Sequence, residues 1–222
     1  MFRRGCEVMA KLPPHPNIIR YINHGRKSGR DFMLLEYIEG ANLRMLAIKD
    51  SDLLKERLSD VLLEMAEALA HVHQHNYMHL DFKPENLQIS RSGALLLCDF
   101  DTTLPIPDGS FKMPKKSGTP LYMPPEIVKG WHVDQRADIY SFGVTAYELV
   151  TRVKPFEGQT PQEMLRNQLN ARYRIRKPRE LNANIPVMLE VLLLKCLSYL
   201  PDSRYHYMAH VVRDLRKCLG VR

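Results

Sequence analysis

The most informative segment of this chain reads His79-Leu80-Asp81-Phe82-Lys83-Pro84-Glu85-Asn86. Pro84 and the short polar residues around it disfavour regular secondary structure, so the segment is predicted to be a tight loop that presents side chains. This loop brings together a carboxylate at Asp81, an ammonium at Lys83 and a carboxamide at Asn86. Such a set of polar groups predicts a chemical site.

A second acidic segment lies at the end of an apolar run. Asp99-Phe100-Asp101 begins thirteen residues after Asn86. Carboxylates and a carboxamide from neighbouring loops suit a hard cation such as Mg²⁺, and the ammonium of Lys83 suits an anionic oxygen. Taken alone, Asp81 or Asp99 would more often be a cap or turn residue. Together these groups are the ones that phosphoryl transfer requires.

Outward from the loop, helical periodicity dominates. Residues 57–76 form the clearest predicted helix, because apolar residues recur there at steps of three and four. These residues are Leu58, Val61, Leu62, Met65, Leu69 and Val72. Residues 139–150 are apolar on most sides, which predicts a central helix. Further helices are predicted near residues 161–170, 188–200 and 207–219.

The first forty residues predict one helix and two strands. A helix over residues 1–12 is stopped by Pro13 and Pro14. Residues 18–21 and 32–38 are apolar and flank a polar turn at residues 25–31, which indicates an antiparallel pair.

Downstream of the loop at residues 79–86, the sequence predicts a hairpin and a long loop. Residues 87–89 and 95–98 flank Arg91-Ser92-Gly93, which is typical of a hairpin turn. Residues 101–123 lack periodicity, and so long a loop within a domain is usually functional. The order of elements predicts an α+β fold that is mainly α-helical.

The composition describes a globular chain of 222 residues with 45% hydrophobic and 26% charged side chains. These fractions exclude a wholly disordered or collagen-like chain. No apolar run approaches the roughly 18 residues of a membrane span, and no apolar segment follows the two N-terminal arginines to make a secretory signal. The four cysteines show no C-x-x-C spacing, so their thiols are expected to be reduced. We expect a cytoplasmic protein without a membrane partner.

The formal net charge of +7 raises the question of nucleic-acid binding. The densest basic cluster lies in residues 172–179 and alternates with Tyr173 and Ile175, as a half-exposed extended segment would. No base-reading motif accompanies it. The pattern therefore favours a solvated face or a protein-docking patch, and no nucleic-acid partner is expected.

Three further motifs complete the pattern. Residues 118–126 read G-T-P-L-Y-M-P-P-E, residues 138–143 read D-I-Y-S-F-G, and Arg204 stands alone near the C-terminus. With H-L-D-x-x-x-x-N and D-F-D, these five motifs resemble, in order and spacing, the eukaryotic-type serine/threonine protein kinase domain. The resemblance covers essentially every residue, from the middle of the small lobe to the end of the domain.

The resemblance implies transfer of the γ-phosphoryl group of ATP to a protein Ser or Thr hydroxyl, assisted by Mg²⁺. Asp81 would orient the substrate hydroxyl, Lys83 would neutralise the transferred group, and Asn86 and Asp99 would hold the metal. Lys83 together with Thr119 in the substrate loop is the serine/threonine variant of the pattern.

The resemblance also implies a nucleotide hinge and a structural frame. Glu36 to Ile38 would bind adenine through backbone groups, with Asn42 near the ribose. The frame consists of two hydrophobic-spine residues, His79 and Phe100, and of Glu126, Asp138 and Arg204. The A-P-E-type glutamate would pair with Arg204, and breaking that buried pair would cost about 3–5 kcal/mol.

Two groups of residues suggest other chemistry but are given structural interpretations. His71, His73 and His75 look like a metal cluster, yet they lie at the end of a helix, a favourable place for imidazolium. A solvated helix end is the preferred interpretation. Cys98 would line the nucleotide pocket and serve in packing.

The sequence departs from the family in the loop that follows the acidic segment. Leu80 replaces the arginine that normally pairs with a phosphate there, which predicts activity that phosphorylation does not gate. Asp101 replaces a glycine, which predicts a loop that changes conformation less freely. The candidate phosphosites are Thr102, Thr103, Ser110 and Ser117.

The third departure concerns the small lobe. The 222 residues contain no G-x-G-x-x-G and no V-A-I-K-like strand. Residues 1–38 are interpreted as the remnant of a truncated β small lobe, and residues 39–222 as the large lobe. Because elements that grip phosphate are missing, little or no turnover is expected from this chain.

The ion-pairing glutamate of the first helix has two alternative registers. Counting from Glu7 places Lys11 one turn later, where the family has an apolar residue. Counting from Gly5 places Met9 there and leaves no glutamate. The sequence leaves both registers open.

A non-catalytic binding module on the same scaffold is the alternative function. A small-molecule phosphotransferase is disfavoured because Thr119, Glu126 and Asp138 belong to a protein-substrate platform. The sequence leaves open the physiological substrate, the upstream regulation, the oligomeric state and whether Met1 is the natural start.

Overall fold

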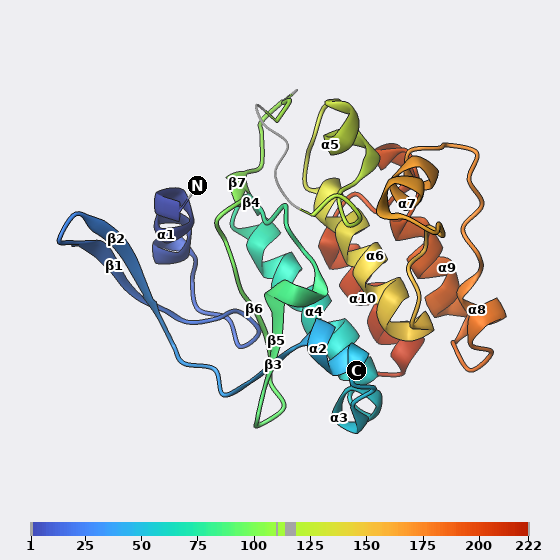
Figure 1. The fold of residues 1–222 in the computed structure, drawn as a ribbon, viewed down its shortest axis with the longest axis horizontal. Coiled ribbons are helices and arrows are strands. Elements are labelled where there is room, and N and C mark those ends of the chain that lie inside the picture. Colours follow the sequence, from blue (N-terminus) through green and yellow to red (C-terminus); the bar gives the residue numbers. More distant parts are fainter. Residues whose placement is uncertain (1, 110, 114–118, 222) are drawn as a thin grey trace.

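A computed structural model describes residues 2–109, 111–113 and 119–221 (Figure 1). Its larger part is organised by helix α6 (Arg136–Thr151), in which every residue except Arg136 and Glu148 is buried. Helices α4 (Leu58–Gln74) and α9 (Val187–Cys196) pack against it, and α10 (Met208–Leu219) packs against α4 and α9. The predicted central helix and the predicted stripe of residues 57–76 are therefore confirmed; of that stripe only Leu58 is half-buried.

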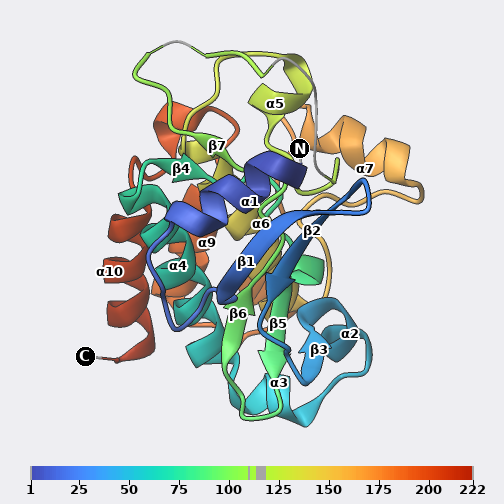
Figure 2. The same ribbon diagram turned by 90° about the vertical axis from the view of Figure 1, so that its left-hand side faces the viewer.

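Shorter elements surround this helical body. They are α1 (Phe2–Lys11), α2 (Leu43–Ile48), α3 (Asp52–Glu56), α5 (Pro125–Lys129), α7 (Pro161–Gln168), α8 (Pro178–Leu181) and the 3₁₀ turns η1 (Pro84–Asn86) and η2 (Pro201–Ser203). Helix α1 contacts β1 and lies on the opposite side of the molecule from α7 and α8 (Figure 1), and Figure 2 views it from that side. Within the described residues, no helix is long and apolar enough to cross a bilayer.

The predicted front hairpin exists with different boundaries. Strands β1 (Tyr21–Lys27) and β2 (Arg30–Leu35) pair antiparallel around a turn at Ser28 and Gly29. Both turn residues have positive φ, 50° and 78°, which is the backbone that continues strand twist into a two-residue turn. The prediction of a seven-residue turn at residues 25–31 was wrong, because the two strands pair as far as Lys27 and Arg30, on either side of Ser28 and Gly29.

Ile18 and Ile19 pair with a different strand than predicted. The amide of Ile19 donates to the carbonyl of Leu97 at 3.0 Å, and Ile18 forms a parallel bridge with Leu97. Both isoleucines are buried in the main core. Their apolar character reflects attachment of the α1–β1 connection to β6 and not membership of the hairpin.

A three-stranded sheet connects residues 40–42 to the two strands that follow the loop at residues 79–86. Strands β3 (Gly40–Asn42), β5 (Leu87–Ser90) and β6 (Leu95–Leu97) pair antiparallel in the order β3-β5-β6. The β5–β6 hairpin confirms the prediction for residues 87–98. Strand β4 (Tyr77–Met78) pairs with β7 (Leu104–Pro105), so the predicted irregular segment 101–123 begins with a short strand.

Gly40 permits the close approach of β3 to β5. A Cβ at this position would overlap the backbone carbonyl of Ile89. We therefore expect Gly40→Ala to destabilise the fold by about 1–3 kcal/mol, measured by urea denaturation. Gly109→Ala is the matched control, because no atom lies within 4 Å of its ideal Cβ. Equal stability of the two variants would contradict the packing of these strands.

The basic segment has the predicted alternation. Arg172, Arg174 and Arg176 are exposed, whereas Tyr173 and Ile175 pack against the cluster around α6. The extended stretch ends where α8 begins at Pro178, so Arg179 is helical. The predicted half-exposed alternation of this segment is confirmed.

Candidate active site

The loop at residues 79–83 is fixed from beneath by Asp138, near the start of α6. Asp138 is fully buried, and its carboxylate accepts hydrogen bonds from the amides of His79 at 2.7 Å and Leu80 at 2.8 Å. Burial favours the neutral acid, but the hydrogen bond from His73 and the nearby backbone donors outweigh it and lower the pKa of Asp138. The carboxylate thus orients the loop and stabilises the left-handed conformation of Leu80, whose φ is 66°.

His73 contributes to this anchor, contrary to the predicted solvated helix end. Its Nε2 lies 2.8 Å from Asp138 Oδ2, and its side chain is only 8% exposed. The turn of α4 that carries His73 faces α6, which local periodicity did not reveal. His71 and His75 instead lie in a row with His15, with ring centroids 4.6 and 4.4 Å apart.

Asp138→Asn should weaken this anchor. An asparagine keeps one acceptor oxygen but presents an amide group to a buried backbone donor, which costs about 1–3 kcal/mol. We expect that loss of stability in urea denaturation, with faster hydrogen exchange at the Leu80 amide. The exposed Asp60→Asn on α4 is the control and should change neither quantity. Unchanged Leu80 exchange in Asp138→Asn would contradict the anchoring role.

Asp81 lies at the centre of the polar groups. Its Oδ2 accepts from Lys83 Nζ at 2.6 Å and from Asn86 Nδ2 at 3.1 Å. Its Oδ1 accepts from the amide of Thr119 at 3.1 Å. Lys83 Nζ also donates to Thr119 Oγ1 at 2.8 Å. The structure thus brings together four residues singled out in the sequence, with Thr119 arriving from a distant loop.

The D-F-D segment lies beside this group. Phe100 is buried, and its ring meets the buried ring of His79 edge-on at a centroid distance of 5.0 Å. Burial lowers the pKa of His79, so this ring packs as neutral imidazole. Asp99 is exposed and has a φ of 63°. Burial raises the pKa of the Cys98 thiol to about 12, which keeps it protonated and unreactive.

The first helix meets Asp101 through Gly5 and not through Glu7. A Cβ on Gly5 would lie 2.7 Å from Asp101 Oδ1 and 3.1 Å from the carbonyl oxygen of Phe100. Met9 is buried one turn later, while Glu7 is exposed. Of the two registers left open by the sequence, the structure has the one without a glutamate, and the Asp101 carboxylate lies against that glycine.

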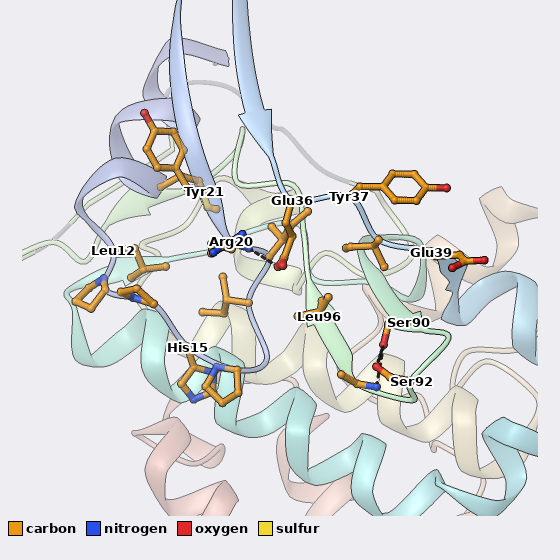
Figure 3. Close-up of a pocket in the computed structure, with 18 of the residues that line it drawn as sticks. Leu12, His15, Arg20, Tyr21, Glu36, Tyr37, Glu39, Ser90, Ser92 and Leu96 are labelled. Carbon is orange, nitrogen blue, oxygen red and sulfur yellow. Dashed lines mark hydrogen bonds between the residues drawn. The ribbon is translucent and has the colours of Figure 1, made fainter.

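Residues 36–38, the predicted hinge, border a cavity of about 1130 Å³ (Figure 3). The cavity lies between residues 12–21, residues 36–39 and the β5–β6 turn, and Glu36 and Ile38 line it. The Glu36 carboxylate accepts from the amide of Arg20 at 2.7 Å, and the Tyr37 ring points away from the cavity. Asp81 and the three residues around it, Lys83, Asn86 and Thr119, do not line it. Asn42 caps α2, accepting from the Met45 amide at 2.9 Å.

Leu80 packs into a second apolar cluster. This cluster contains Met78, Leu80, Met123, Ile127, Val133 and Ala137, and the partly buried Leu104, Ile106, Phe111, Met113 and Val128 pack against it. Leu80, which stands where the family has an arginine, therefore packs in one apolar cluster with Met123 of the long loop and Ile127 of α5.

The candidate phosphosites in the long loop are restricted. The hydroxyl of Thr102 donates to the carbonyl of His79 at 2.9 Å, and Thr103 is fully buried. Ser110 and Ser117 lie outside the described residues. Met1 lies outside them too, as does Gly118, the first residue of the motif at residues 118–126.

Glu126 and Arg204 form a fully buried pair between α5 and η2. The two guanidinium nitrogens lie 2.6 and 2.8 Å from the two carboxylate oxygens. Arg204 also donates to the carbonyls of Ser198, Tyr199 and Arg136. This geometry joins the end of the substrate-type loop to the C-terminal helices.

Sequence analysis missed a charged group beside the catalytic-type loop. Arg44 in α2 contacts Glu85 and Glu148. Tyr122 and Lys154 also contact Glu148. Glu148 and Lys154 are close in sequence, but Arg44, Glu85 and Tyr122 are far from them and from one another. The local signal was Glu148, the one charged residue within the apolar run of residues 139–150.

The geometry and the comparisons identify the same class of protein. Residues 1–214 match the family described as the protein kinase domain, and the chain belongs to that family. It is 30% identical to the serine/threonine-protein kinase PknB of Mycolicibacterium smegmatis, over 96% of this chain and 35% of that protein. PknB of Mycobacterium leprae is likewise 30% identical, over 96% of this chain and 35% of that protein. The chain spans about a third of the length of these relatives.

Proposed function

We propose that this chain carries the phosphoryl-transfer site of a serine/threonine protein kinase. The observation that supports this most is the convergence of Lys83, Asn86 and Thr119 on the Asp81 carboxylate. Asp81 would orient a Ser or Thr hydroxyl and accept its proton as the new phosphate ester forms. Lys83 would neutralise the transferred group, and Thr119 would hold the substrate segment beside the carboxylate.

Asn86 and Asp99 fit a magnesium ion. Asn86 donates through Nδ2 to both the backbone carbonyl and the carboxylate of Asp81, which directs its Oδ1 away from that loop. Asp99 is an exposed carboxylate at the end of β6. These oxygen donors are the type that Mg²⁺ prefers. When bound with ATP, the ion would neutralise negative charge on the phosphates.

The adenine of ATP would bind through backbone groups of residues 36–38, with Asn42 near the ribose. We expect slow turnover from the 222-residue chain, since these residues supply no glycine-rich loop and Gly5 lies where an ion-pairing glutamate would stand. We also propose that residues 1–38 and 39–222 belong to the small and large lobes. The four free cysteines support a cytoplasmic location.

Two measurements test this function. ATP with Mg²⁺ should raise the melting temperature of the purified chain, and labelled γ-phosphate should appear as phosphoserine or phosphothreonine on a library of Ser/Thr peptides. Transfer to tyrosine peptides alone, or to small hydroxyl compounds alone, would overturn the proposal.

The alternative function is a non-catalytic binding module, and Gly5 against Asp101 is the observation that favours it. This alternative requires that ATP with Mg²⁺ leaves the melting temperature unchanged while the chain still binds a partner protein. A nucleotide-dependent shift together with peptide phosphorylation would exclude it.

A further inference from the structure

A partly buried charged group lies between α2 and α6, and its Glu85 side chain is 40% exposed. We call it the Arg44 cluster, and it consists of Arg44, Glu85, Tyr122, Glu148 and Lys154. Arg44 donates to Glu148 at 2.8 and 3.2 Å and to Glu85 at 2.9 Å. Lys154 Nζ lies 2.8 Å from Glu148 and 4.4 Å from the centre of the Tyr122 ring. The side chains of Arg44, Glu148 and Lys154 are only 23%, 12% and 23% exposed.

The Arg44 cluster is continuous with the reacting groups at two points. Glu85 directly precedes Asn86 in η1. Tyr122 closes a turn whose first residue is Thr119, since its amide donates to the Thr119 carbonyl at 2.9 Å. Thr119 in turn contacts Asp81 and Lys83. Glu85 therefore lies next to the groups that a substrate hydroxyl at Asp81 would meet.

The charges of this cluster are internally balanced. Two carboxylates, Glu85 and Glu148, face two cations, Arg44 and Lys154. Although burial favours the neutral acid, the Arg44 and Lys154 contacts outweigh it and hold the pKa of Glu148 below its usual range. The Tyr122 hydroxyl contacts Arg44 and donates to Glu148 at 2.6 Å.

We propose that Arg44 occupies the carboxylate pair Glu85–Glu148 from within and thereby excludes arginine and lysine side chains of the peptide substrate. The inference rests on the proposed kinase function. Two acidic side chains beside a substrate loop would attract a basic peptide, but here a guanidinium of the chain itself already spans both. A second cation would meet Arg44 and Lys154 as like charges. Arg44 is thus a specificity determinant, and the peptide segment beside Glu85 is non-basic.

Peptide binding tests this inference without requiring turnover. The probes are fluorescein-labelled peptides with one serine among neutral residues, and variants with a single arginine at each of three positions before and after the serine. For the wild-type chain we expect every arginine peptide to bind within about threefold of the neutral parent. For Arg44→Gln we expect one arginine peptide to bind about tenfold tighter than the parent, because a charge-assisted bond to the vacated carboxylates becomes available.

Three variants separate specificity from folding. Arg44→Lys retains a cation between the carboxylates and should restore the wild-type lack of preference. Arg44→Gln combined with Glu148→Gln should lose the new preference. Arg213→Gln, in an exposed pair on α10, is the control and should match the wild type.

Several outcomes would overturn the inference. One is a wild-type chain that binds an arginine peptide tenfold tighter than the parent. Others are an Arg44→Gln variant that weakens all peptides equally, and the absence of binding to any peptide. Phosphate transfer to the same peptides is measured in parallel. If no variant transfers phosphate, the proposed function fails, while the binding preferences still decide the role of Arg44.

Discussion

Replacing Asp81 with asparagine is expected to lower phosphate transfer to serine peptides by about 10²–10⁴-fold, the usual contribution of a positioned acid–base group. An asparagine can still accept the Thr119 amide through its oxygen, so the substrate loop remains in place. It can no longer accept a proton from the substrate hydroxyl, and Lys83 loses its counter-ion. The rate is measured with labelled ATP on the same peptide for both forms.

The fold and nucleotide binding should survive this change. The melting temperature and its shift with ATP and Mg²⁺ should stay close to those of the wild-type chain, because Asn86 and Asp99 are untouched. Asp108→Asn, an exposed acid in the long loop, should transfer phosphate at the wild-type rate. An Asp81→Asn variant that keeps more than a tenth of the wild-type rate would show that this carboxylate does not act on the substrate.

Replacing Arg204 with methionine is expected to cost about 3–5 kcal/mol of unfolding free energy in urea denaturation. The change leaves the Glu126 carboxylate buried without its partner. It also removes the donors to the carbonyls of Ser198, Tyr199 and Arg136. Methionine fills a similar volume, so loss of charge pairing and hydrogen bonding, and not a cavity, accounts for the destabilisation.

A second substitution separates these contributions. Glu126→Leu in the Arg204→Met background removes the unpaired carboxylate and should recover part of the loss, but not all of it, because three backbone carbonyls still lack a donor. Arg213→Met, in the exposed pair with Asp214, should change stability by less than about 1 kcal/mol. An Arg204→Met variant as stable as that control would contradict the importance of the buried pair.

The parts of the fold that local patterns determine were predictable. The α4 stripe and the β5–β6 hairpin follow from side-chain spacing and turn residues that lie close together in the sequence. The predicted boundaries of β1 and β2 were wrong, because the turn is set by the positive φ of Ser28 and Gly29 and not by the polarity of the neighbouring residues. The pairing of Ile18 with Leu97 depends on a strand far along the chain, which no local period encodes.

The site shows the same division. Asp81, Lys83 and Asn86 lie in one loop, so their proximity could be inferred from the sequence. His73 was misassigned because its partner, Asp138, lies on another helix. Gly5 carries no side chain to reveal its contact with Asp101. Arg44 is an ordinary surface-type residue in the sequence. The packing of α2 against η1 brings it to Glu85, and its side chain also reaches Glu148 on α6.

The packing of Leu80 has a consequence for the conditions under which the long loop stays in place. A loop attached through a phosphate–arginine pair loosens in high salt or after phosphatase treatment, because screening or hydrolysis removes the attraction. Apolar contacts among Leu80, Met123 and Ile127 respond to neither. Their strength instead falls on cooling, as hydrophobic burial does near room temperature. We therefore expect cooling to weaken the contacts of Leu80 with Met123 and Ile127.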